Sequence, residues 1–185
     1  FFGVTLLAFN KDIGTPLSWY TVLFVTSLVG LIGAYYFKTI YTLLFSIVGL
    51  SSWWVAQAMQ WIDGKNIKSA AILAGSSFIA LLLYSLGHLH EEKNKFKRFA
   101  LVYSVLGLIA VTGTLFFFSS KAGLDVLGDM TKGESFLGSW QLTLSLLFLL
   151  AALVGVTLLA AARKLMSLLE MLAIFILTAL FGVIA

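Results

Sequence analysis

The sequence contains no cysteine and few charged residues, and both absences limit what the protein can be. Without cysteine there is no disulfide, no thiol nucleophile and no thiolate metal site. Charged residues make up 11% of the 185 residues and hydrophobic residues 61%, whereas about a quarter of a soluble domain is charged. So few charges cannot cover the surface of a water-soluble protein of this size. We therefore expect an integral membrane protein whose outer surface faces lipid.

The sequence also lacks the motifs of several enzyme and carrier classes. It has no Gly-x-Ser-x-Gly elbow, no His-Glu-x-x-His zinc motif and no P-loop. No lysine lies in the middle of a hydrophobic run to carry a retinal Schiff base, and both arginines lie outside the runs, which excludes a voltage sensor. The two histidines are two residues apart, so they cannot hold a haem from separate helices. The sequence favours a protein without a cofactor and without enzymatic activity.

Six hydrophobic runs approach or reach the length of about 20 residues that a membrane-spanning helix needs. They do not alternate between polar and apolar residues as the strands of a membrane β-barrel do. The runs are 17–37, 39–62, 69–87, 99–118, 140–162 and 165–185. A further apolar stretch, 1–9, is too short to span and is interpreted as the end of a truncated span. The expected fold class is all-α: a polytopic membrane helical bundle of about six full transmembrane helices plus part of a seventh.

This bundle is expected to form a single transmembrane domain over residues 1–185, within a longer chain. Thr15 as N-cap and Pro16 at the first helical position are expected to start the helix 17–37. The next turn, near Lys38, contains neither glycine nor proline. Length requires it, because a single helix over 17–62 would measure about 70 Å, against a hydrocarbon core of about 30 Å.

The basic residues of the loops predict the orientation of the bundle. With alternating loops, the side that holds Lys11 (side A) carries five lysines and the opposite side (side B) carries seven cations. Those of side A are Lys11, Lys65, Lys68, Lys121 and Lys132; those of side B are Lys38, Lys93, Lys95, Lys97, Arg98, Arg163 and Lys164. Because cytoplasmic loops are rich in lysine and arginine, we expect side B to be cytoplasmic. In a prokaryote the membrane is then the inner one.

One face of the predicted helix 39–62 carries polar and indole side chains. This α3 stripe consists of Ser46, Gly49, Trp53, Gln57, Gln60 and Trp61. Because two glutamines facing lipid are costly, they should face other helices or a wet cavity. Trp53, Gln57, Gln60 and Trp61 therefore either line a solute path or make interhelical polar contacts, with Trp61 at the membrane interface.

Glu170 is the only acid inside a predicted span, about 9 Å beyond the loop at Arg163 and Lys164. An acid at this depth is a candidate for handling protons or a cation. The alternative is an interfacial carboxylate beside Arg163, which lies one heptad away on the same face.

Two other groups of polar residues are weaker candidates for metal sites. His88 and His90 lie just past the predicted span 69–87, and imidazole is a common metal ligand, but residues two apart point about 200° away from each other on a helix. Asp125 and Asp129 share a helical face, yet Ca²⁺ takes at least about six oxygen ligands. For both pairs the alternative is a solvated loop, and we expect no bound metal.

Small residues four apart predict close helix packing at three places. Gly30 with Ala34, Ala71 with Gly75, and Ala151 with Gly155 each fit the small-xxx-small pattern of membrane helix interfaces.

Part of the sequence resembles a known family. The segments Gly87-His88-Leu89-His90, 97–108 and Phe116-Phe117-Phe118-Ser119 are similar to the later membrane portion of the prokaryotic multi-pass proteins catalogued as domain of unknown function 2157. The resemblance implies a multi-pass membrane protein, and it carries over no functional residues because the family has no assigned activity.

Two functions fit these observations. The first is a transporter or channel-like protein for a neutral or apolar solute, with a path beside Trp53, Gln57, Gln60 and Glu170. The second is a non-enzymatic membrane subunit that packs against a partner protein or organises lipid. The expected partners are membrane lipid, other membrane subunits or further copies of the chain. Nucleic acid is not expected, because the net charge of +4 is small and lies near the ends of the hydrophobic runs.

Overall fold

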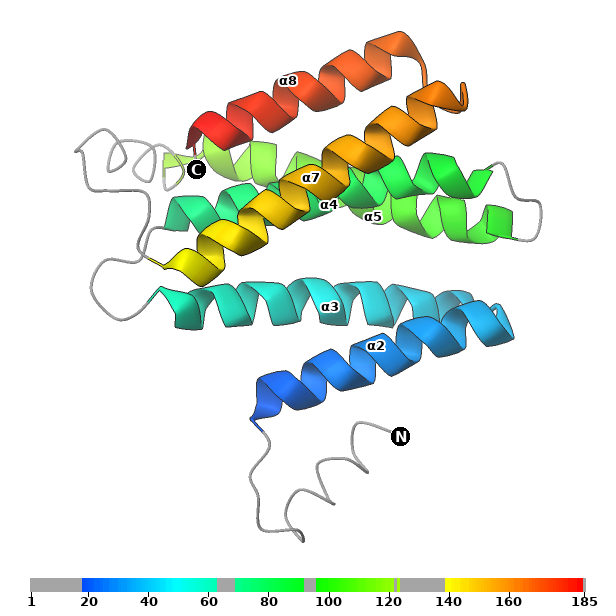
Figure 1. Ribbon diagram of the computed structural model, residues 1–185, viewed down its shortest axis with the longest axis horizontal. Coiled ribbons are helices and arrows are strands. Elements are labelled where there is room, and N and C mark those ends of the chain that lie inside the picture. Colours follow the sequence, from blue (N-terminus) through cyan, green and yellow to red (C-terminus); the bar gives the residue numbers. More distant parts are fainter. Residues whose placement is uncertain (1–17, 63–68, 92–95, 122, 124–138, 185) are drawn as a thin grey trace, which may run out of the picture. The chain divides into compact units, whose positions relative to one another are not determined.

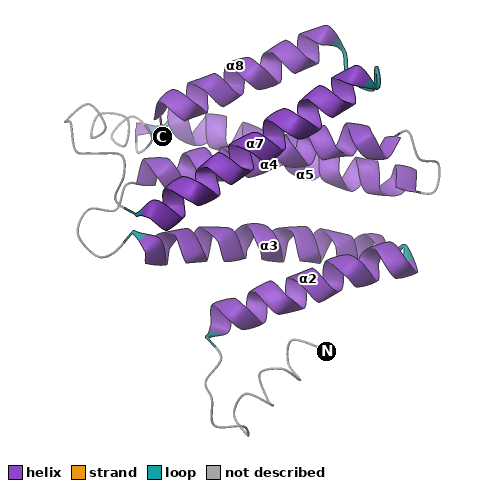
Figure 2. Ribbon diagram, in the orientation of Figure 1, coloured by secondary structure: helices purple, strands orange, loops and turns teal. Residues whose placement is uncertain are grey.

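The computed structural model describes residues 18–62, 69–91, 96–121, 123 and 139–184. Long apolar helices make up nearly all of these residues. In those residues there are six helices and no strand (Figures 1 and 2). The helices are α2 (Trp19–Phe37), α3 (Ile40–Trp61), α4 (Ser69–Glu91), α5 (Lys97–Ser119), α7 (Trp140–Ala162) and α8 (Leu168–Ile184). Within the same ranges, α2, α3, α4, α5 and α7 are long and apolar enough to cross a membrane. The predicted all-α membrane bundle is confirmed.

The helices carry apolar side chains outward and several polar ones inward. Ile109, Phe148 and Ile176 are 62%, 72% and 66% exposed, whereas Ser77, Ser85 and Thr157 are fully buried. A protein surrounded by water shows the opposite preference. Lipid as the surrounding solvent accounts for the distribution.

The chain divides into two compact units, and the first contains α2 and α3 up to Gln57. A tight turn at Lys38 joins the two helices. Lys38 has the left-handed conformation (φ 56°), and the backbone N–H of Thr39 donates to the carbonyl of Ala34 at 3.1 Å. This is a Schellman-type helix end, and it forms the turn that span length required.

The start of α2 differs from the prediction. Ser18 is the N-cap, and its hydroxyl accepts a hydrogen bond from the backbone N–H of Thr21 at 3.4 Å. Thr15 and Pro16, the predicted cap and first helical residue, lie outside the described residues. The helix therefore begins at Trp19, two residues after the predicted start of the span.

Where α2 and α3 face each other, each helix places a glycine against a serine of the other helix. Gly30 of α2 lies against Ser46 of α3, and Gly49 of α3 lies against Ser27 of α2. A Cβ atom on Gly30 would come within 2.5 Å of the Ser46 hydroxyl oxygen. Small residues let membrane helices approach closely, and the predicted pair of Gly30 and the buried Ala34 contributes to this packing.

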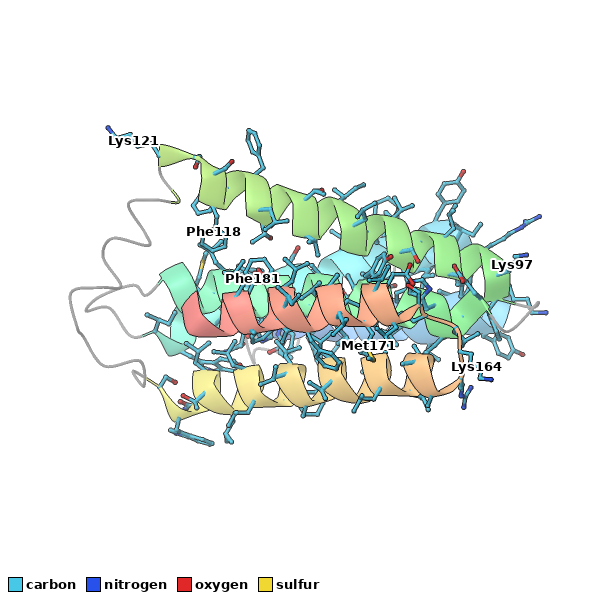
Figure 3. All side chains as sticks on the ribbon, turned by 90° about the horizontal axis from the view of Figure 1, so that it is seen from above. Lys97, Phe118, Lys121, Lys164, Met171 and Phe181 are labelled. Atoms are coloured by element: carbon cyan, nitrogen blue, oxygen red, sulfur yellow. The ribbon has the colours of Figure 1, made fainter. Side chains whose placement is uncertain are left out.

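The second unit contains α4, α5, α7 and α8, with α4 packed against each of the other three. At the α4–α5 contact the helix backbones touch, because a Cβ on Gly107 would lie 2.6 Å from the backbone nitrogen of Tyr84. Between α5 and α8, Phe118 stacks on the buried Phe181 with ring centroids 6.0 Å apart (Figure 3).

The other two small-residue pairs behave differently from each other. Ala71 and Gly75 are buried on α4, as close packing requires. Ala151 and Gly155 are exposed on α7, and no heavy atom of the described residues lies within 4 Å of a Cβ built on Gly155. The predicted packing through Ala151 and Gly155 is therefore wrong for contacts within the described residues.

A second tight turn joins α7 to α8. Lys164 has φ 57°, its backbone N–H donates to Ala161 at 2.9 Å, and that of Leu165 donates to Ala160 at 3.0 Å. These two bonds define a Schellman motif with Lys164 at the position that usually holds glycine. For an L-residue the left-handed conformation costs about 1–2 kcal/mol.

Some sequence predictions fall outside the described residues. They concern the segment 1–9, the pair Asp125 and Asp129, and several of the loop lysines, which are Lys11, Lys65, Lys68, Lys93, Lys95 and Lys132.

Candidate functional site

The N-terminal part of the α3 stripe, from Ser46 to Trp53, is covered by α2. Ser46 and Gly49 lie against Gly30 and Ser27, and the Trp53 ring packs on Phe24 with centroids 4.4 Å apart. The Ser46 hydroxyl donates to the carbonyl of Thr42 at 2.7 Å. From Ser46 to Trp53 the stripe is thus an interface between two helices.

The C-terminal part of the stripe, from Gln57 to Trp61, is more open. Gln57 and Trp61 are half-buried and Gln60 is exposed, in the last turns of α3. All three follow Trp53 on the same face, as the helical spacing requires. Their participation in a solute path stays a prediction.

Glu170 lies in the first turn of α8, where it completes a capping box. Its carboxylate accepts hydrogen bonds from the backbone N–H and the hydroxyl of Ser167, both at 2.8 Å, and its own N–H donates to the Ser167 hydroxyl at 3.2 Å. Such reciprocal bonds satisfy backbone donors that the first turn of a helix leaves unpaired. One role of Glu170 is therefore to fix the start of α8 at Leu168, three residues after the predicted start of the span.

Glu170 also connects α8 to α4. The hydroxyl of Tyr84 on α4 lies near the Glu170 carboxylate. The sequence analysis did not identify Tyr84. Its spacing to His88 and Glu91, four and seven residues, places the three on one helical face, but this signal exists only if α4 continues past Gly87.

Helix α4 does continue past the predicted end of its span, and it carries both histidines. The structure ends α4 at Glu91, so His88 and His90 lie in its last turns instead of in a loop. The His88 ring meets the Tyr84 ring edge-on, with centroids 5.0 Å apart, and its Nδ1 lies 3.7 Å from a carboxylate oxygen of Glu91. We call Tyr84, His88, Glu91 and Glu170 the α4–α8 cluster.

His88 is the least satisfied member of this cluster. The residue is 9% exposed, and neither ring nitrogen has a hydrogen-bond partner among the described residues. A neutral imidazole presents one N–H donor and one acceptor. Leaving such a group buried and unpaired costs about 1–3 kcal/mol, so His88 is a position in this unit where an additional polar group would be favourable.

His90 points away from His88. Its Nδ1 lies 2.8 Å from the carbonyl oxygen of Leu86, and its ring stacks on Tyr103 of α5 with centroids 5.0 Å apart. The two histidines thus lie on opposite sides of α4 and are not placed to bind the same metal ion. Where residues are described, no group of three potential ligands is placed to hold a metal ion.

Hydroxyl groups continue the polar side of α4 into the unit. The Ser85 hydroxyl lies 3.0 Å from that of Thr157 on α7, and both residues are fully buried. Deeper in the helix, the buried Ser77 donates to the carbonyl of Leu73 at 2.7 Å. Ser77, Ser85 and the α4–α8 cluster together form the α4 polar face.

Comparison of the chain with protein-family profiles, with curated proteins and with solved structures finds no match.

Proposed function

We propose that this multi-pass membrane protein is a transporter or channel-like protein for a small neutral solute. The observation that carries the proposal is His88, a buried imidazole whose two ring nitrogens have no hydrogen-bond partner among the described residues. A solute with a hydroxyl or amide group can accept from and donate to the two ring nitrogens. It thereby removes a cost that the protein alone leaves in place.

The α4 polar face supplies the remaining groups of the proposed path. Ser85 and Thr157 hold hydroxyls inside the unit at a depth where lipid offers no hydrogen bonds. Glu91, half-exposed at the end of α4, marks the entrance on side B. Gln57 and Gln60 of α3 carry amides suited to the same class of solute and are tested as a separate candidate path.

Chemical labelling tests the path directly, since the chain has no native cysteine. Single-cysteine variants Ser85→Cys, Gln57→Cys and Gln60→Cys in proteoliposomes are exposed to a charged, water-soluble methanethiosulfonate reagent. We expect labelling at Ser85 and at one or both glutamine positions, because a hydrated path admits the reagent. Ile109→Cys is the control, because residue 109 is 62% exposed on the outer surface of α5 and should face lipid.

A flux assay connects the path to His88. Proteoliposomes are challenged with a glycerol gradient, and their swelling is followed by light scattering. The variant His88→Phe should lower the glycerol flux, whereas His90→Phe should retain it because a phenyl ring preserves the stacking on Tyr103. Two results together would reject the transport function. One is the absence of labelling at Ser85, Gln57 and Gln60, and the other is a glycerol flux in wild-type proteoliposomes equal to that in protein-free vesicles.

The second candidate is a non-enzymatic membrane subunit that packs against a partner protein. Two observations favour it. Helix α2 covers the stripe from Ser46 to Trp53, and the small residues Ala151 and Gly155 are exposed on α7, one turn apart. Exposed small residues let a second helix approach closely. If this candidate holds, Gly155→Leu abolishes the assembled species in native mass spectrometry. Gly113→Leu, at an equally open glycine of α5, leaves it intact.

A further inference from the structure

We propose that His88 binds a proton in competition with the solute, so that acidification closes the proposed path. This role of His88 rests on the proposed function and adds a second ligand, H⁺, to the same imidazole. It depends on two features of the α4–α8 cluster. One is the pair of carboxylates around His88, and the other is the exposure of Glu91.

The ring nitrogens of His88 suit a hydroxyl or amide solute only while the imidazole is neutral. A neutral imidazole offers one N–H donor and one acceptor nitrogen, whereas the protonated ring offers two donors and no acceptor. Neither nitrogen has a hydrogen-bond partner among the described residues, so both are available to a ligand. A proton from water binds at the acceptor nitrogen, and no bond of the protein breaks. Because the proton and a solute donor use the same lone pair, binding of one excludes the other.

Two carboxylates from two helices are placed to balance the charge of a protonated His88. An oxygen of Glu91 on α4 lies 3.7 Å from Nδ1, a distance that suits an ion pair and exceeds that of a hydrogen bond. Glu170 of α8 lies near enough for its charge to interact with that of His88. A buried charge is costly unless it is paired. The cluster therefore supplies the counterions that a protonated imidazole needs in this position.

The other groups around His88 carry no charge that opposes this pairing. The Tyr84 ring meets the imidazole edge-on, and a phenol stays neutral below about pH 10. In the part of the chain that the structure describes, α5 and α7 contribute no charged group that interacts with His88. The cations in the first turn of α5 and in the turn after α7 are exposed; they are Lys97, Arg98, Arg163 and Lys164. Glu91 and Glu170 are thus the described acids that act on His88.

Glu91 gives protons in water access to the buried ring. Its side chain is 50% exposed, whereas that of His88 is 11% exposed. Chains of acidic and histidine side chains form the proton relays of membrane pumps and transporters. The order from water to Glu91 to His88 is a short relay of this kind. Acidification therefore loads His88 from the end of α4.

Nitrogen NMR tests proton binding without any solute. The full-length variant His90→Phe keeps a ring to stack on Tyr103 and leaves His88 as the only histidine of the chain. With isotopically labelled histidine in proteoliposomes, the spectra distinguish a neutral ring from a protonated one. We expect a neutral ring at about pH 8 and a protonated ring at about pH 5, because histidine changes its charge in this range. A ring that stays neutral at about pH 5 would overturn the proposal.

The pH dependence of glycerol flux tests the competition. After subtraction of protein-free vesicles at each pH, the wild-type flux should fall at least about fivefold from about pH 8 to about pH 5. In His88→Gln an amide keeps a donor and an acceptor but does not titrate, so whatever flux remains should not vary with pH. His90→Phe is the matched control and should respond as the wild type does. Glu91→Gln removes one counterion and should show a smaller fall.

The two measurements separate failure of this proposal from failure of the proposed function. A wild-type flux that does not change with pH, or an equal fall in His88→Gln, would overturn the competition. A wild-type flux equal to that of protein-free vesicles at every pH would reject the proposed function. The spectra of His90→Phe would then still decide whether His88 binds a proton.

Discussion

Lys38 and Lys164 hold backbone conformations that glycine adopts more easily, with φ angles of 56° and 57°. Each ends a helix through a Schellman-type arrangement, and each follows the negative end of that helix's macrodipole. The favourable charge at a helix C-terminus offsets part of the steric cost. Both turns show that a short connection between antiparallel membrane helices needs neither glycine nor proline.

Substitution of Lys38 compares the steric cost of the left-handed conformation with the favourable interaction between the lysine charge and the helix macrodipole. Lys38→Gly should raise the free energy of unfolding by up to about 1 kcal/mol, because relief of the left-handed strain exceeds the loss of the dipole interaction. Reversible unfolding in mixed micelles of detergent and SDS gives the number. Ala151→Gly is the control, since it introduces glycine at an exposed position in the middle of α7 and should destabilise by about 1 kcal/mol. Destabilisation by Lys38→Gly would show that the lysine charge dominates.

Glu170 has a capping role that can be separated from its charge. Ser167→Ala removes both the hydroxyl donor and the acceptor of the capping box and should cost about 1 kcal/mol of stability. Glu170→Gln retains an oxygen that accepts from the Ser167 N–H, so it should cost less. The same unfolding assay compares the two variants, and an equal or larger loss in Glu170→Gln would mean that the carboxylate charge itself stabilises the start of α8.

Most helices, but fewer of their ends, could be predicted from the sequence. The six hydrophobic runs correspond to the six described helices because span length and apolar composition determine them. The end of α4 could not be predicted from composition, since His88, His90 and Glu91 are typical of a solvated loop. Contacts of His88 with Tyr84 and of His90 with Tyr103 accompany the helical continuation to Glu91.

The contact between α4 and α5 depends on glycine at position 107. A methyl group there would come within 2.6 Å of the Tyr84 nitrogen and 2.7 Å of the Ala80 carbonyl oxygen, both backbone atoms of α4. Gly107→Ala should therefore separate the helices and destabilise the unit by about 1–3 kcal/mol. Gly113→Ala, on the same helix with open space around it, should be neutral or slightly stabilising. Equal stabilities of the two variants in micelle unfolding would contradict the close packing.

The arrangement of the candidate site could be predicted only in part, because it depends on packing between helices. Helical spacing placed Trp53, Gln57 and Gln60 on one face, but it could not show that α2 covers Trp53. Tyr84 and Glu170 are far apart in the sequence, and only the contact of α4 with α8 brings them near each other. Local periodicity describes each helix and contains no information on its neighbours.

The orientation predicted from the loop charges can be tested by reporter fusions. Alkaline phosphatase fused after Arg98 should be inactive, and after Lys121 active, because side B is predicted to be cytoplasmic. Fluorescent-protein fusions at the same positions should give the inverse pattern. Activity of the phosphatase at Arg98 would reverse the topology.

Lipid surrounds the outward faces of these helices, and spin-label accessibility measures this most directly. Nitroxides placed at Ile109 of α5 and Phe148 of α7, which are 62% and 72% exposed, are examined in proteoliposomes with oxygen and with a water-soluble nickel chelate. We expect strong relaxation by oxygen, which concentrates in the bilayer, and almost none by the nickel chelate. Strong relaxation by the nickel chelate at both positions would place these faces in water and contradict the membrane bundle.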